Sequence, residues 1–179
     1  MMAGMKSIWN RVAALLTLGV IYVTPLHAQN LEAIKQTIRK RFPSVRQLST
    51  GALADWLQDT NRPVPLLVDV RAEEEFAVSH LQKARRCESV SEVKRAAASA
   101  GQPIVVYCSV GYRSSALAEK LQRAGLTNVY NLEGSLFAWA NESRAVYRGD
   151  ARLQPARVHP YDAKWGQLLE AQLRSGAAP

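Results

Sequence analysis

Three short runs dominated by apolar residues indicate buried strands. They are Leu66–Val70, Ile104–Tyr107 and Asn128–Leu132. Apolar stretches of this length are typical of strands that are covered on both faces of a parallel sheet. The first run also carries an acid, Asp69, near its end. We expect these segments to form the centre of a sheet.

Apolar residues recur at helical spacing between the strand candidates. This spacing predicts helices over Val90–Ala100 and Ser114–Ala124. Gly125 is placed to cap the second helix at its C-terminal end, and Leu126 is placed for the apolar contact that accompanies such a cap. Strands that alternate with helices predict an α/β fold with helices on both faces of the sheet and a site at the carboxyl edge of the strands.

The chain before these strands carries a helical pattern of its own. Leu31, Ile34, Ile38 and Phe42 recur at helical spacing, and Pro43 ends the run. The pattern predicts an amphipathic helix within residues 29–43. Its basic residues form either a solvated face on a packed helix or a surface for anionic lipid.

Two further elements are predicted before the first buried strand. Val45–Leu48 is expected to form a short strand. A helix should follow, with Leu53, Trp56 and Leu57 on one side, and the proline-containing loop Asn61–Pro65 ends it.

The C-terminal part, residues 143–179, lies beyond the last predicted strand and helix. Tyr161–Leu173 predicts a short helix that packs back on the rest of the protein. Three ring-bearing residues in this region offer a second interpretation, a surface that binds a partner or controls access to the site. They are His159, Tyr161 and Trp165.

The first 28 residues have the pattern of a secretory signal. Lys6 and Arg11 precede the uncharged apolar run Val12–Val23, and a small residue, Ala28, closes the segment. The run is shorter than the ~20 residues that a membrane-spanning helix needs. We therefore expect cleavage near Ala28 and a periplasmic or secreted protein without stable membrane insertion. A membrane-anchored protein facing the periplasm is the alternative.

Composition and charge narrow the classes of protein. The 179 residues are 47% hydrophobic and 21% charged, which is typical of a globular chain. The formal net charge of +8 falls to +6 when Lys6 and Arg11 leave with the signal. Basic runs interleaved with aromatic residues are absent from the sequence, so we expect no nucleic-acid partner. Cys87 and Cys108 are too few for a disulfide scaffold and wrongly spaced for zinc, so we expect no metal.

The segment Cys108–Ser114, CSVGYRS, is the strongest candidate for chemistry. It lies between a predicted strand and a predicted helix, where backbone N–H groups and the helix dipole favour an anion and lower the pKa of a thiol. Gly111 permits a tight turn, and Arg113 adds a forked cation that suits an oxyanion. The alternative is that Cys108 is a small buried apolar residue at a strand end.

Three segments together resemble the rhodanese domain family. They are Val68–Leu81, the loop CSVGYRS, and Leu132–Ser135 followed by Ala138–Trp139, in the family's order and at its usual separations. The resemblance covers residues 44–142. It implies a single domain with a parallel five-stranded sheet flanked by helices, to which residues 29–43 and 143–179 are helical attachments.

The resemblance also implies an activity, sulfur transfer through a persulfide on Cys108. The thiolate would attack a small anionic sulfur donor such as thiosulfate, and a thiol or cyanide-like acceptor, possibly a protein thiol, would then take the sulfur. No cofactor is needed. The substrate-binding residues that the resemblance implies are Ser109, Val110, Gly111, Tyr112, Arg113 and Ser114.

The resemblance gives other polar residues a supporting role. Asp69 ends the strand beside the one that leads to Cys108, and Arg71 is expected to bond Glu75 or nearby carbonyls. Both are expected to be mainly structural, and so is His80, since a thiolate activated by amides needs no general base.

The sequence departs from the family pattern at three positions. Lys83 stands where glycine is common, Cys87 where an aliphatic residue is usual, and Ser135 replaces the second of two glycines. We expect none of them to touch the loop. In the family's sheet order the strand near Cys87 lies two places from that of Cys108, ~10 Å away, which predicts two free thiols.

Two other functions are compatible with the sequence. One is a phosphatase or arsenate reductase of the same fold, whose loop holds one more residue between cysteine and arginine than the four between Cys108 and Arg113. The other is a module without catalysis that carries persulfide or binds a partner. The shorter loop favours a sulfurtransferase.

Overall fold

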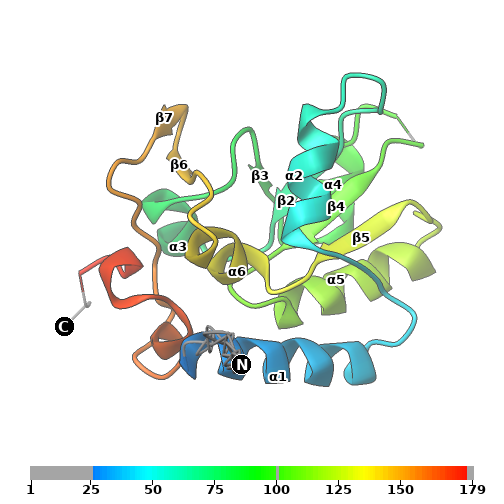
Figure 1. Cartoon of the computed structure of the whole chain (residues 1–179). Helices are drawn as coiled ribbons and strands as arrows, with labels where there is room; N and C mark the ends of the chain where they lie inside the picture. The colour runs from blue at the N-terminus through cyan, green and yellow to red at the C-terminus, as the bar shows by residue number, and fades with distance from the viewer. Residues whose placement is uncertain (1–25, 100, 177–179) are drawn as a thin grey trace, which may run out of the picture.

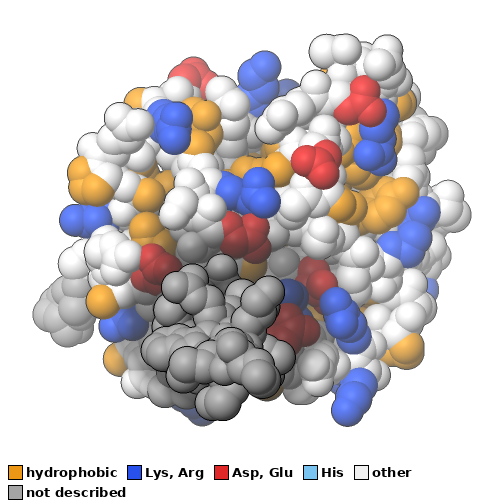
Figure 2. Space-filling model, viewed as in Figure 1, with side chains coloured by type: hydrophobic (Ala, Val, Ile, Leu, Met, Phe, Trp, Pro, Cys, Tyr) orange, Lys and Arg blue, Asp and Glu red, His pale blue; other side chains and the backbone are white. Residues whose placement is uncertain are grey.

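The computed structural model describes residues 26–99 and 101–176. The predicted signal, residues 1–28, lies almost wholly outside this part of the chain. Within the described residues, no helix is both long and apolar enough to cross a bilayer. On the face in Figure 2, basic and acidic side chains are interspersed.

A parallel sheet of five strands forms the centre of the protein (Figure 1). The strand order is β1-β5-β4-β2-β3, so β4 lies in the middle and pairs with β2 and β5. This confirms the predicted α/β fold. The strands are β1 (Arg46–Leu48), β2 (Leu66–Asp69), β3 (Arg85–Arg86), β4 (Ile104–Tyr107) and β5 (Val129–Leu132).

Helices cover both faces of this sheet, as predicted. They are α1 (Leu26–Arg41), α2 (Thr50–Gln58), α3 (Glu73–Val78), α4 (Val90–Ala96), α5 (Tyr112–Arg123) and α6 (Ser135–Asn141). Successive side chains of β4 point to opposite faces. Val105 therefore joins the core that holds α2 and α6, while Val106 joins the core that holds α4 and α5.

Two predicted helix boundaries need correction. The helix expected to reach Ala100 ends at Ala96, because Ala97 is extended and the Gln102 side chain accepts the N–H of Ala98 at 2.8 Å. Helix α5 begins two residues earlier than expected, with Gly111 as its N-cap. On α2, Leu57 shares a side with Leu53, as expected, but it lies in the last turn of the helix and is 43% exposed.

The C-terminal segment packs on the domain, as predicted, but not as one helix. Two 3₁₀ turns, η1 (Trp165–Leu168) and η2 (Ala171–Leu173), replace the predicted helix. Leu169 between them has an extended backbone, and its side chain is buried in the core. The Asn141 side chain donates to the Leu168 carbonyl and accepts the N–H of Glu170, so it holds the chain on both sides of Leu169. Figure 1 shows this red segment beside the blue start of α1. Before it lies a hairpin of β6 (Tyr147–Arg148) and β7 (Ala151–Arg152).

The predicted cap of α5 is confirmed. Gly125 has φ +89°, and its N–H donates to the Gln122 carbonyl at 3.0 Å. The N–H of Leu126 donates to the Leu121 carbonyl at 3.0 Å, which completes a Schellman motif. The turn directs the chain into β5.

We predict that Gly125→Ala destabilises the protein. A Cβ at this position would meet nothing within 4 Å, so the cost is the left-handed backbone alone, ~1–2 kcal/mol. The measurement is the free energy of unfolding in urea. The matched control is Gly51→Ala inside α2, where φ is not positive and alanine should be neutral or stabilising. Equal effects at both positions would contradict this account of the cap.

Candidate active site

The loop between β4 and α5 curls around the sulfur of Cys108. Gly111 has φ +110°, in the left-handed region. A Cβ there would lie 3.3 Å from the Asn131 amide nitrogen and 3.5 Å from a methyl carbon of Ile38. Glycine is therefore required both for the backbone conformation and for the space. The curl brings the Gly111 N–H to 3.1 Å from Sγ of Cys108.

The surroundings of Cys108 stabilise its thiolate. Burial by itself raises the pKa of the thiol. Hydrogen bonds from the hydroxyl and N–H of Ser114, the positive charge of Arg113 and the Gly111 N–H outweigh burial, so the pKa of Cys108 lies below its ordinary value. The structure therefore brings together the cysteine, the glycine and the arginine that the sequence singles out.

Asn131 takes part in this arrangement, which the sequence did not indicate. The Ser114 hydroxyl lies 2.6 Å from Oδ1 of Asn131 and 3.5 Å from Sγ of Cys108. A hydroxyl has one proton, and the shorter contact is the stronger hydrogen bond. The backbone N–H groups of Gly111 and Ser114 are thus the steadier donors to the sulfur.

The guanidinium of Arg113 is paired with a buried carboxylate. Its two terminal nitrogens donate to the two oxygens of Glu75 at 2.7 and 2.8 Å, and one also donates to the Ser109 hydroxyl at 3.0 Å. Burial by itself raises the pKa of Glu75. The hydrogen bonds and positive charge of Arg113 outweigh burial, so the pKa of Glu75 lies below its ordinary value and the carboxylate is ionised. The Arg113 guanidinium, which we expected to hold the oxyanion of a donor, is therefore paired with Glu75 of the protein itself.

The supporting pair Asp69 and Arg71 is wholly buried. Arg71 donates to both carboxylate oxygens of Asp69, at 2.9 and 2.7 Å, and to the Ser79 carbonyl at 2.5 Å. The expected bond to a nearby carbonyl is present, whereas Glu75 bonds Arg113. The pair ties the end of β2 to the chain after α3, and neither residue lines the pocket described below.

His80 is held by hydrogen bonds on both ring nitrogens. Nδ1 lies 2.8 Å from the Leu81 carbonyl, and Nε2 accepts the N–H of Gly149 at 3.1 Å. The ring stacks on Phe76, with centroids 4.2 Å apart. These contacts agree with the structural role expected for it.

The expectation that Ser135 does not touch the loop is wrong. Its hydroxyl accepts the N–H of Cys108 at 3.1 Å and donates to the Leu132 carbonyl at 3.0 Å. The first N–H groups of α6, those of Leu136 and Phe137, donate to the carbonyls of Cys108 and Ser109. The start of α6 therefore holds the backbone of the loop at Cys108 and Ser109 through hydrogen bonds. Ser135 has φ +51°, which explains why glycine suits this position.

The other two departures lie away from the loop. Lys83 has φ +57°, again a conformation that favours glycine. Cys87 follows β3 and is separated from Cys108 by the intervening strand β2. Both cysteines are free, as predicted. Burial and the charge of Glu92 raise the pKa of Cys87.

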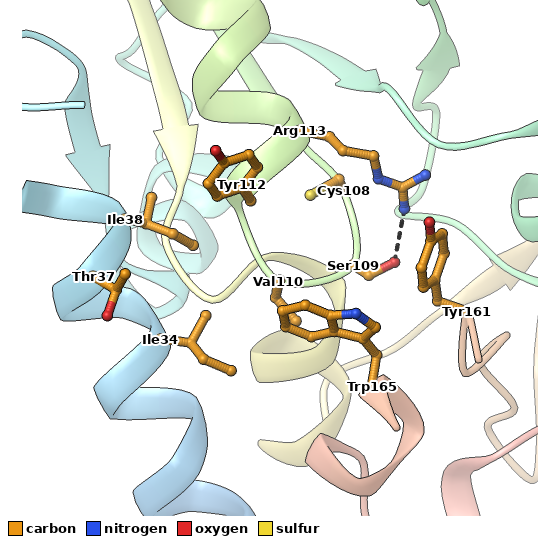
Figure 3. A pocket seen from close by; sticks show the side chains of 10 residues that line it. All are labelled: Ile34, Thr37, Ile38, Cys108, Ser109, Val110, Tyr112, Arg113, Tyr161 and Trp165. Atoms are coloured by element: carbon orange, nitrogen blue, oxygen red, sulfur yellow. Dashed lines mark hydrogen bonds between the residues drawn. The ribbon is translucent and has the colours of Figure 1, made fainter. Parts of the chain in front are cut away.

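A pocket of about 420 Å³ opens beside Cys108, below it in the view of Figure 3. Its walls come from α1, from the loop and from the C-terminal segment. The lining residues are Ile34, Thr37, Ile38, Cys108, Ser109, Val110, Tyr112, Arg113, Tyr161 and Trp165. The second interpretation of the C-terminal segment thus has a structural counterpart, since two of its three ring-bearing residues face the site.

The pocket wall from the C-terminal segment is fixed by two contacts. The Tyr161 ring lies 4.9 Å from the guanidinium carbon of Arg113. The Tyr161 N–H donates to Nδ1 of His159 at 3.0 Å, and His159 does not line the pocket. Among the described residues, no group of three or more histidine, cysteine, aspartate or glutamate side chains could hold a metal.

Comparison with known proteins matches this geometry to a family. The profile of the rhodanese-like domain matches residues 49–142, just over half of the chain. Thiosulfate sulfurtransferase GlpE of Pseudomonas aeruginosa is 34% identical over 85 residues, which cover 47% of this chain and 74% of that protein. The tRNA uridine(34) hydroxylase of Cupriavidus necator is 34% identical over 122 residues, 62% of this chain and 42% of the hydroxylase.

Other relatives are matched in part. The uncharacterised Bacillus subtilis protein YqhL is 31% identical over 80 residues, and the chain spans 64% of its length. Among solved structures, a thiosulfate sulfurtransferase from Pseudomonas aeruginosa superposes with a TM-score of 0.57 at 19% identity, over 68% of this chain and 23% of that one. The rhodanese-like domain of the Anabaena protein Alr3790 superposes with a TM-score of 0.51 at 20% identity, over 58% of this chain and 80% of that one. The chain belongs to the rhodanese-like family.

Proposed function

We propose that the protein is a sulfurtransferase that carries a sulfane sulfur as a persulfide on Cys108. The observation that supports this most directly is the position of Sγ. It lies inside a curl of backbone N–H groups, has a lowered pKa and faces an open pocket. Family membership supports the same chemistry.

The reaction would take place in two displacements. The Cys108 thiolate attacks the outer sulfur of a donor such as thiosulfate. A new S–S bond forms on Sγ, the S–S bond of the donor breaks, and its electron pair leaves with sulfite. The terminal sulfur of the persulfide is an anion, which N–H groups of the curl stabilise. An acceptor thiolate or cyanide then attacks that sulfur, and the Cys108 thiolate is the leaving group.

The geometry disfavours a phosphatase. Phosphoryl chemistry needs a cation that faces the oxygens of the transferring group. Here both terminal nitrogens of Arg113 are engaged by Glu75, and the loop has only four residues between Cys108 and Arg113. Such a loop suits a single sulfur atom better than a tetrahedral phosphate.

We predict that Cys108 forms its iodoacetamide-reactive thiolate at a lower pH than an ordinary cysteine does. Its lowered pKa places the midpoint of alkylation below that of glutathione, a free thiol. The measurement is the alkylation rate as a function of pH in the variant Cys87→Ala, in which Cys108 is the remaining cysteine. In the matched variant Cys108→Ala, the remaining Cys87 should react slowly, with a midpoint above that of glutathione, because burial raises its pKa. A Cys108 midpoint at or above that of glutathione would contradict the account.

We predict turnover that depends on Cys108. The purified protein should form thiocyanate from cyanide and a sulfane-sulfur donor, with thiosulfate as the first donor to test. Cys108→Ser should lower the rate to that of the uncatalysed reaction, because a hydroxyl cannot carry the sulfur. Cys87→Ala should retain the rate, since Cys87 follows β3 and β2 separates it from the strand that leads to Cys108. Activity that survives in Cys108→Ser would rule out the proposed intermediate.

A further inference from the structure

We propose that the preferred sulfur donor carries an aromatic or branched apolar group, which binds in the pocket between α1 and the C-terminal segment. This inference rests on the proposed sulfurtransferase function and adds a substrate class to it. The donor would bear a single negative charge at its reactive end. Thiosulfate would be a poor substitute for it.

The first observation is where the pocket walls come from. Ile34 and Ile38 belong to α1, and Trp165 belongs to η1. All three lie outside residues 49–142, the part that matches the family. The loop chemistry does not need them, so they determine which molecules fit beside Cys108. The chain has thus added a binding wall to the shared domain.

The second observation is the character of these walls. Figure 3 shows Ile34, Val110 and Trp165 around the space below Cys108. Two polar side chains in the lining already have partners within the protein: the Thr37 hydroxyl donates to the Ala33 carbonyl at 2.9 Å, and the Ser109 hydroxyl donates to Glu75 at 3.0 Å. A pocket of this kind binds a ligand chiefly through apolar contact.

The third observation concerns charge. Among the residues that line the pocket, Arg113 is the one cation. Glu75 neutralises it, and the Tyr161 ring lies over its guanidinium. The N–H curl can stabilise one negative charge, on the transferred sulfur. The second charge of thiosulfate would lie against apolar side chains with no free cation, which costs desolvation energy.

The fourth observation concerns the size of the pocket and the contacts that hold its wall. The volume of about 420 Å³ falls in the range of sites for small organic molecules and far exceeds the need of an inorganic anion. Helix α1 is fixed by the ion pair of Arg39 with Glu133, 2.7 Å between Nη2 and Oε2, and by the edge contact of Phe42 with Tyr112. A wall held by such contacts contributes binding energy with little cost of ordering.

Benzenethiosulfonate is a suitable probe of this class. Its outer sulfur forms the S–S bond with Sγ of Cys108, and the S–S bond of the probe breaks. The electron pair leaves with benzenesulfinate. One anion and one thiolate give one persulfide anion and one sulfinate, so atoms and charge balance.

The experiment compares three donors with cyanide as the common acceptor. They are benzenethiosulfonate, methanethiosulfonate and thiosulfate, and each kcat/KM is divided by the rate of the same donor with glutathione. We expect the ratio to be highest for benzenethiosulfonate and lowest for thiosulfate. In Trp165→Ala, the preference for the benzene over the methane compound should fall about tenfold, and Trp165→Phe should keep most of it.

A second variant does not depend on the C-terminal segment. Thr37→Lys places a cation at the exposed rim of the pocket and should raise kcat/KM for thiosulfate relative to benzenethiosulfonate. Gln36→Lys makes the same change one residue earlier on α1, outside the lining, and should alter neither value.

The outcomes separate the two proposals. Equal corrected ratios for the three donors, unchanged in Trp165→Ala and Thr37→Lys, would overturn the substrate class while the sulfurtransferase stands. If no donor transfers sulfur to Cys108, the proposed function fails and the substrate class fails with it.

Discussion

The curl of backbone around Sγ of Cys108 is the constraint on which the rest of the structure depends. Several elements hold it in place. The start of α6 donates to the Cys108 carbonyl, Ser135 accepts the Cys108 N–H, and Glu75 of α3 fixes the Arg113 side chain. The first two belong to α6, which follows β5, whereas Glu75 belongs to α3, which follows β2. The sheet therefore brings to one edge the groups that keep a short loop tightly curled.

This arrangement divides the work of the site between two kinds of interaction. The N–H groups face the sulfur and stabilise its negative charge. The Arg113 guanidinium is instead bonded to the buried carboxylate of Glu75. In the proposed function, the loop therefore holds a single anionic sulfur atom and not a tetrahedral group. What lies beyond that atom is decided by α1 and the C-terminal segment, which present apolar side chains.

The sequence alone predicts the core strands and the reactive loop but not the contacts between distant segments. The apolar runs of β2, β4 and β5 are visible because both faces of each are covered. Strand β3 is two arginines and has no periodicity to detect. Glu75 could pair with Arg71 or Arg113, and only the placement of α3 decides. The role of Ser135 depends on φ +51° after Gly134, which residue identity does not reveal.

The most direct test of the central claim is mass spectrometry of the protein after treatment with a sulfane-sulfur donor. The account predicts that the intact protein gains the mass of one sulfur atom and loses it again with cyanide. Fragmentation should place that atom on the peptide containing Cys108 and not on the one containing Cys87. An unchanged mass with every donor tried, or a gain on Cys87 alone, would contradict the persulfide mechanism.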